Sequence, residues 1–229
     1  MDAHACFETR HGRDETLLTH RHGQAYAALV LDGAHVEICV DGSFHCTPGT
    51  LLLHPHFHAH GNRFSRSGAR VINIALPDSV AIDTFRALQV PRVDEAQDIF
   101  ARDPAALPAL IAAARADGSI ALPDWQLALL QALASNDASI GEICQLLGVS
   151  AAHASRALLR SHGMSPQLLR RELRWRRALS LLRGDASLAE IAAQSGFADQ
   201  SHLTRIVRKH TGLPPAALRR QIKSVQDSG

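Results

Sequence analysis

The stretch SLAEIAAQSGFADQSHLTRIVRKHTGLPP, residues 187–215, decides the fold of the C-terminal half because it repeats an earlier stretch. Residues 139–166 read SIGEICQLLGVSAAHASRALLRSHGMSP, and the two segments align from the first serine to the last proline with one extra residue in the second. Self-similarity of this kind indicates that one supersecondary unit occurs twice. The sequence therefore predicts two copies of the same helical motif.

Each copy carries the signals of a capped helix, a turn and a second helix. Both open with Ser-x-x-Glu, at Ser139 and Ser187, which is the capping box that starts a helix. Nine residues later Gly148 and Gly196 offer a left-handed backbone that ends this helix, and Gly-x-x-Pro closes each copy. The pattern predicts two helix-turn-helix motifs. Two unrelated helical hairpins are the alternative, which the agreement of caps, charge and duplication disfavours.

A single helix is predicted to connect the copies. Ser165-Pro166 supplies a cap and a first-turn proline, and apolar residues recur at helical spacing as far as Arg183. A helix over 165–183 is about 28 Å long at 1.5 Å per residue. The second helices of the two motifs can therefore lie about one turn of DNA apart, roughly 34 Å.

The charge of the chain is divided between its two halves. Residues 1–155 carry 10 Lys and Arg against 17 Asp and Glu, and residues 156–229 carry 14 against 5. The net charges of the two parts are therefore about −7 and +9. An acidic front joined to a basic tail is typical of a sensing domain attached to a domain that binds a polyanion. A merely solvated basic surface is the alternative.

The last hundred residues resemble the DNA-binding domain of the AraC/XylS family of transcription regulators, most closely over residues 187–215. The resemblance implies double-stranded DNA and RNA polymerase as partners. It implies base contacts from the second helix of each motif, and the basic residues of both helices are expected to hold phosphates or to be solvated. The implied DNA-contact residues are Ala152, Ser155, Arg156 and Arg160 in the first motif, and Gln200, Ser201, Thr204, Arg205, Arg208 and Lys209 in the second, with Arg219 and Arg220 as further phosphate contacts.

The front half is predicted to be an antiparallel β-domain. Short apolar runs at 26–31, 36–40, 50–53 and 71–76 indicate strands, and Asp32-Gly33 and Asp41-Gly42 are hairpin-turn signals. Residues 105–116 and 125–134 indicate helices, which are candidates for pairing two copies of the chain as a homodimer. We predict an α+β chain with a β-barrel sensor domain over 1–78, a helical linker or dimerisation segment over 79–118, and an all-α DNA-binding domain over 119–229.

Ten of the 14 histidines lie in the first 60 residues. The order His20-x-His22, Gly33, Pro48-Gly49, Pro55 and His60 resembles the two motifs of a cupin barrel, although residues 24–27 contain no glutamate. The resemblance implies a divalent metal ion held by His20, His22 and His60, with His56 and His58 as alternates. Imidazole ligands favour Zn²⁺, Ni²⁺ or Cu²⁺.

Other functions stay open for the front half. A small organic effector without metal, a purely structural histidine cluster, and a cupin-type metalloenzyme with a basic appendage are the alternatives. No Ser/His/Asp or Cys/His arrangement is evident, so we expect a regulator and not an enzyme. The chain has no long apolar stretch and no secretion signal, so a cytoplasmic location with reduced cysteines and no membrane partner is expected.

Overall fold

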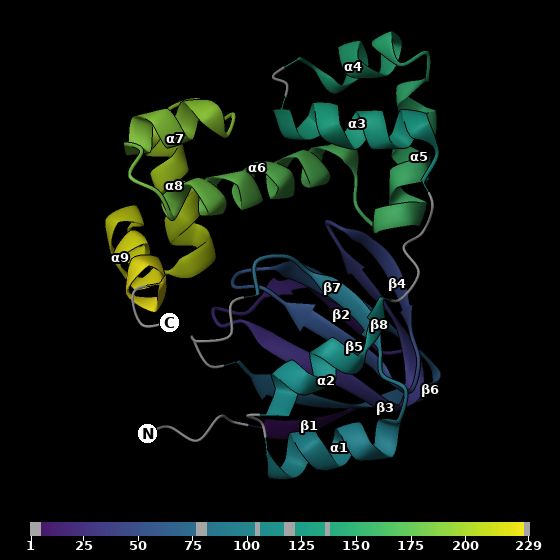
Figure 1. Ribbon diagram of the computed structural model, residues 1–229. Coiled ribbons are helices and arrows are strands. Elements are labelled where there is room, and N and C mark those ends of the chain that lie inside the picture. The colour runs from purple at the N-terminus through teal and green to yellow at the C-terminus, as the bar shows by residue number, and fades with distance from the viewer. Residues whose placement is uncertain (1–5, 77–81, 104–105, 117–121, 136–137, 227–229) are drawn as a thin grey trace. The chain divides into compact units, whose positions relative to one another are not determined.

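The computed structural model describes residues 6–76, 82–103, 106–116, 122–135 and 138–226. The chain divides into two compact units, residues 1–120 and 121–229. The first contains the β-sheet with helices α1 and α2, and the second contains helices α3 to α9 (Figure 1). This confirms the predicted fold class, an antiparallel β-domain followed by an all-α domain. The predicted boundary near residue 118 lies outside the described residues.

The first unit contains one antiparallel sheet. Its strands are β1 (Cys6–His11), β2 (Thr16–Arg21), β3 (Tyr26–Cys39), β4 (Gly42–Cys46), β5 (Thr50–His54), β6 (Ala59–Ala75), β7 (Arg86–Gln89) and β8 (Arg115–Ala116). The order is β1-β6-β3-β5-β7-β8, while β2 pairs with β6 and β4 pairs with β3. The long strands β3 and β6 pair along most of their length. On its other side, β3 pairs with β5 near its start and with β4 near its end.

Glycine bulges interrupt the register of the two long strands. The β3–β6 register shifts on both sides of Gly33, which has a φ of 74°. A Cβ atom there would lie 2.1 Å from the carbonyl oxygen of Gly68, itself at a φ of 67°. Bulges of this kind bend strands and increase their twist. The predicted hairpin turn at Asp32-Gly33 is therefore wrong, because the same glycine conformation serves a bulge within one continuous strand.

The other predicted turn is confirmed, since Cys39 at the end of β3 pairs with Gly42 at the start of β4. The sheet is buried on both faces, which explains the uninterrupted apolar runs in the sequence. Ala27 and Leu29 belong to one core cluster, and Ala28 and Val30 belong to the other, as the alternation of side chains along a strand requires.

Two helices pack on the sheet. They are α1 (Val93–Arg102) and α2 (Leu107–Ala113), and Ala96 and Leu110 are buried with the strand residues of one core cluster. Residues 79–116, where the structure describes them, thus belong to the first unit. The helix predicted over 105–116 ends at Ala113, because residues 115–116 form β8 against β7; Pro104 and Ala105 lie outside the described residues.

The second unit consists of α3 (Asp124–Ser135), α4 (Ile140–Leu146), α5 (Ala151–His162), α6 (Pro166–Leu182), α7 (Leu188–Gln194), α8 (Gln200–Thr211) and α9 (Pro215–Gln226). Both predicted capping boxes are present, and Gly148 and Gly196 have the left-handed conformation, with φ values of 67° and 72°. The connecting helix α6 has 17 residues and is about 26 Å long, slightly shorter than predicted. No helix among the described residues is both long and apolar enough to span a membrane.

Candidate functional site

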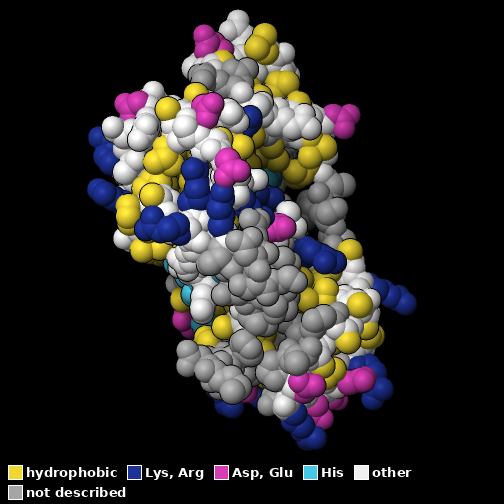
Figure 2. Space-filling model, turned by 60° about the vertical axis from the view of Figure 1, so that its left-hand side comes forward, with side chains coloured by type: hydrophobic (Ala, Val, Ile, Leu, Met, Phe, Trp, Pro, Cys, Tyr) yellow, Lys and Arg dark blue, Asp and Glu magenta, His cyan; other side chains and the backbone are white. Residues whose placement is uncertain are grey.

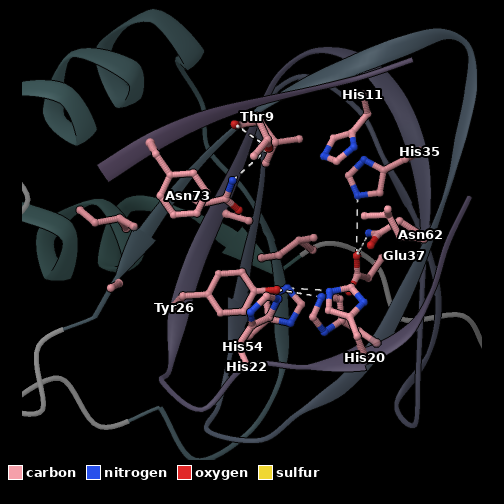
Figure 3. Close-up of a pocket in the computed structure, with 18 of the residues that line it drawn as sticks. Thr9, His11, His20, His22, Tyr26, His35, Glu37, His54, Asn62 and Asn73 are labelled. Atoms are coloured by element: carbon pink, nitrogen blue, oxygen red, sulfur yellow. Dashed lines mark hydrogen bonds and ion pairs between the residues drawn. The ribbon is translucent and has the colours of Figure 1, made fainter. Parts of the chain in front are cut away.

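A cavity of about 430 Å³ lies inside the first unit, and five strands contribute its lining. Figure 3 shows His20, His22 and His54 gathered beside Tyr26, with Glu37, Asn62, His35 and His11 farther along the wall. Apolar side chains such as Leu17, Leu52 and Val71 line other parts of it. The cavity therefore combines an apolar wall with a dense group of imidazoles, a lining suited to a small ligand or an ion.

The structure brings the predicted ligands His20, His22 and His60 together. One ligand atom from each lies within 4.8 Å of the other two, in a group that ranges from exposed His22 to buried His60. His20 comes from β2 and His60 from β6, and the two residues are register partners. The segment 24–27, where a metal-binding cupin has its glutamate, contributes Tyr26, whose hydroxyl lies 2.9 Å from His60 Nε2.

His56 and His58, the predicted alternate metal ligands, lie in different surroundings. Residues 54–60 do not form one strand, because β5 ends at His54 and β6 begins at Ala59. Between them Phe57 adopts a φ of 56°, and the chain turns. His56 Nδ1 lies 2.8 Å from the Gly23 carbonyl oxygen, and His56 joins no histidine group of the described residues. His58 does join one, with His54 and His60, all three of them buried.

Burial keeps several of these imidazoles neutral. Desolvation, reinforced by the neighbouring His20 and His58, lowers the pKa of His60 to about 2. The same cause, with further help from His60 and His58, lowers the pKa of His54 well below its usual value. His22 is exposed in part, and partial desolvation together with the neighbouring His20 lowers its pKa as well. Neutral imidazoles keep a lone pair available, which is the state that binds a metal ion.

Sequence patterns assign no role to four residues that the structure places at this cluster: Tyr26, Glu37, Asp41 and His54. Glu37 is 1% exposed, and its Oε1 has no hydrogen-bond partner among the described residues. Its signal in the sequence is an acidic residue inside an apolar strand, two positions before Cys39. Such a residue is either paired within the core or directed at a ligand, since a buried carboxylate without a partner is costly.

In the second unit the two helix-turn-helix motifs are built alike. Ser150 and Asp199 cap α5 and α8 by accepting from the third backbone N–H of each helix, and Gly163 and Gly212 end them in the left-handed conformation. Arg170 from α6 donates to the Ala138 carbonyl oxygen at 2.8 Å. Arg219 from α9 donates to the equivalent Ala186 carbonyl oxygen at 2.6 Å, which gives this arginine a structural role; its phosphate contact stays a prediction.

The predicted contact residues lie on the outer faces of α5 and α8. In α5 the buried residues are Ala154, Ala157, Leu158 and His162, and in α8 they are Leu203 and Val207. The opposite positions are exposed or half-buried; they are Ala152, Ser155, Arg156 and Arg160 in α5, and Gln200, Ser201, Thr204, Arg205, Arg208 and Lys209 in α8. Figure 1 shows α5 and α8 at opposite ends of α6, and Figure 2 shows Lys and Arg side chains gathered on one face of this unit.

Comparison with known proteins finds similarity within the second unit. A family model described as a helix-turn-helix domain matches residues 129–221. The transcriptional regulator RipA of Corynebacterium glutamicum is 41% identical over 92 residues, which is 39% of this chain and 28% of RipA. The chain thus matches less than a third of the length of that relative.

Two solved structures are similar. An AraC-type regulator from Chromobacterium violaceum has 28% identity and a TM-score of 0.38, over 42% of this chain and 88% of that one. ToxT from Vibrio cholerae, solved with a naphthalenyl butenoic acid, has 13% identity and a TM-score of 0.44, over 96% of this chain and 100% of ToxT. The family match and the RipA alignment agree with the duplicated motif: residues 129–221 are similar to helix-turn-helix domains, among them that of a transcriptional regulator.

Proposed function

We propose that this protein is a sequence-specific transcription regulator that binds DNA through α5 and α8, changes the access of RNA polymerase, and responds to a ligand in its β-domain. The observation that carries the proposal is the duplicated motif, which presents two outward helix faces with cationic side chains at the ends of one connecting helix. Side chains on such helices reach base edges in the major groove, and the surrounding cations hold phosphates.

Arg205 tests the assignment of base contacts. A guanidinium grips guanine O6 and N7 as a fork, whereas a lysine keeps the charge and loses the fork. We expect Arg205→Ala and Arg205→Lys both to weaken binding to a selected duplex by about 1–3 kcal/mol and to relax the preference at one base position. Fluorescence anisotropy with the selected duplex and its single-base variants provides the measurement.

Arg208→Ala is the matched comparison, because Arg208 is exposed one turn after Arg205. Removing a phosphate-binding cation at this position weakens binding to all sequences alike. It also reduces the slope of log affinity against log salt concentration by about 1. If Arg205→Lys bound every base variant as the unchanged protein does, Arg205 would be a phosphate contact and the base assignment would be wrong.

For the β-domain we propose a divalent transition metal ion, Zn²⁺, Ni²⁺ or Cu²⁺, held by His20, His22 and His60. The residues fit this group, since their ligand atoms cluster within 4.8 Å, and the pKa values of His22 and His60 are lowered, so these two rings are neutral. Three imidazoles with an open position suit these ions better than Mg²⁺ or Ca²⁺. Tyr26 holds one nitrogen of His60 and thereby orients its ring.

Metal analysis of the full chain purified without a histidine tag tests this proposal. We expect one of these ions to copurify, His22→Ala and His60→Ala to lower its content, and DNA affinity to change when the metal is removed by a chelator. A chain that binds none of the three ions, with unchanged DNA affinity on their addition, would contradict metal sensing.

A small organic effector is the second candidate, and the unpartnered Oε1 of Glu37 favours it. The cavity of about 430 Å³ has the size of a small-molecule site, and its buried carboxylate lacks a hydrogen-bond donor at this oxygen among the described residues. A ligand with an apolar body and a donor group would satisfy both features. If a small organic molecule bound to the chain in the presence of a chelator, and this binding were lost in Glu37→Gln, the ligand would be of this kind.

A further inference from the structure

A second group of three histidines lies deeper in the β-domain than the pair His20 and His22. His54, His58 and His60 are all buried, and one ligand atom from each lies within 4.8 Å of the other two. The Nδ1 atoms of His54 and His58 share a hydrogen bond at 3.2 Å, whose proton an ion bound by both rings would replace. A tetrahedral ion with nitrogen ligands at 2.0–2.1 Å holds these atoms roughly 3.3 Å apart. The two rings already have the separation that a shared ion requires.

The outward nitrogen of each ring has an oxygen neighbour. The Asp41 Oδ2 atom lies 3.2 Å from His58 Nε2, and the Tyr26 hydroxyl lies 2.9 Å from His60 Nε2. The Glu37 Oε1 atom lies 3.8 Å from His54 Nε2. In metal sites a ligating histidine typically donates its second N–H to a carboxylate, a carbonyl or a similar oxygen, which fixes the tautomer and leaves the other nitrogen for the metal. His58 shows that arrangement with Asp41. Glu37 lies beside His54 but beyond hydrogen-bond distance, and His60 contacts Tyr26 through Nε2 and the His58 carbonyl oxygen through Nδ1 at 3.4 Å.

Packing fixes the orientation of the rings. Tyr26 stacks on His54 with centroids 4.4 Å apart, and Phe85 stacks on His58 at 4.9 Å. The side-chain amide of Asn62 donates to the other carboxylate oxygen of Glu37, which anchors that group beside His54. Ligands whose rotamers are fixed in this way lose little freedom when an ion binds.

Asp41 also lies near the thiol of Cys39, in a third cluster with His58. The Cys39 thiol donates to Asp41 Oδ2 at 4.0 Å, and His58 Nε2 lies 3.2 Å from the same oxygen. We assign Asp41 the role of a positioning group for His58.

We propose that His54, His58 and His60 form a second, inner position for a divalent transition metal ion, with Asp41 orienting His58 and Tyr26 orienting His60. This inference extends the metal-sensing part of the proposed function and is independent of the outer residues His20 and His22. Because both positions include His60, an ion can pass from the outer group to the inner one by exchanging two ligands.

The test measures Zn²⁺ affinity of the full, untagged chain by competition with a chromophoric chelator. The double variant His20→Ala/His22→Ala removes the outer position, and we expect it to retain one Zn²⁺. Adding Asp41→Asn to it removes the carboxylate but no ligand, and we expect a further 10–100-fold loss of Zn²⁺ affinity. Asp32→Asn is the matched control, since Asp32 lies in β3, the strand that leads to Asp41, and accepts a hydrogen bond from Gly33 N; it is expected to leave the affinity unchanged.

Asp41→Asn keeps a similar side chain at the β3–β4 turn, so a folded variant is expected, and circular dichroism checks it. If the double variant lost all Zn²⁺ while the unchanged chain bound it, the inner position would be refuted and the outer one would stand. Equal affinities for Asp41→Asn and Asp32→Asn would likewise refute the role of Asp41. A chain that bound no Zn²⁺ at all would refute both positions, while DNA binding would remain to be judged by its own titration.

Discussion

At the scale of single residues, the properties of the β-domain depend on histidines that burial keeps neutral. Folding lowers the pKa of His60 from 6.5 to about 2, and it lowers that of His54 as well. The unfolded chain therefore binds protons near pH 6.5 that the folded chain does not bind. Because the unfolded state holds more protons, stability is greatest above pH 6.5 and decreases as the pH falls below it.

We predict that His60 alone lowers the free energy of unfolding by about 1.4 kcal/mol for each pH unit between pH 6 and pH 4, and that His54 acts in the same direction. Hydrogen exchange of β5 and β6 at pH 7, 6 and 5, in the presence of a chelator, measures the effect after correction for the intrinsic exchange rate. His60→Asn removes one of the two groups and should make the dependence shallower. An equal dependence in that variant would show that His60 titrates normally.

Candidate metal ligands could be predicted from the sequence where a motif fixed their spacing, as for His20, His22 and His60. Tyr26, Glu37, Asp41 and His54 could not be assigned in this way. They reach the cluster through strand pairing and through the left-handed turn at Phe57, and neither leaves a local signal in the sequence. A pairing between distant strands depends on the register of the whole sheet.

At the scale of elements, the helices begin and end where local chemistry dictates. Ser139 and Ser187 accept from the backbone N–H of Glu142 and Glu190, and each glutamate accepts from the N–H of its serine. These bonds lower the pKa of both glutamates. Their contribution to stability is thus present above the usual glutamate pKa and is lost as the pH falls through the lowered value.

We predict that Ser187→Ala destabilises the helical unit by about 0.5–2 kcal/mol through the loss of this cap. Urea unfolding followed by tryptophan fluorescence measures it, because both tryptophans of the chain, Trp125 and Trp175, lie in this unit. Ser180→Ala, at an exposed position inside α6, is the control and should be neutral or slightly stabilising. A Ser187→Ala protein as stable as the control would mean that the cap contributes nothing.

Turn signals were less informative than caps. Asp41-Gly42 makes a hairpin, whereas Asp32-Gly33 makes a bulge, although the two dipeptides are the same. The difference lies in the facing strand, where Gly68 leaves room for a close backbone contact with Gly33. A dipeptide reports that a positive φ is available, and the partner strand decides how it is used.

At the scale of the whole molecule, duplication allows one chain to present two recognition helices, a task that other regulators give to a dimer. This was predictable because the repeat, the caps and the basic charge are all local features of the sequence. The closure of the sheet around a cavity was predictable only in outline, from a resemblance. The residues that line that cavity follow from the structure.

Salt dependence of DNA binding tests the central claim most directly. The exposed cations assigned to phosphates are Arg160, Arg208, Lys209 and Arg220. Four such contacts predict that affinity of the full chain for a selected duplex falls about 10²-fold between 50 and 200 mM salt, while a residual preference over random DNA persists. Absence of association with either duplex at 50 mM salt, or an affinity that salt does not change, would contradict the account.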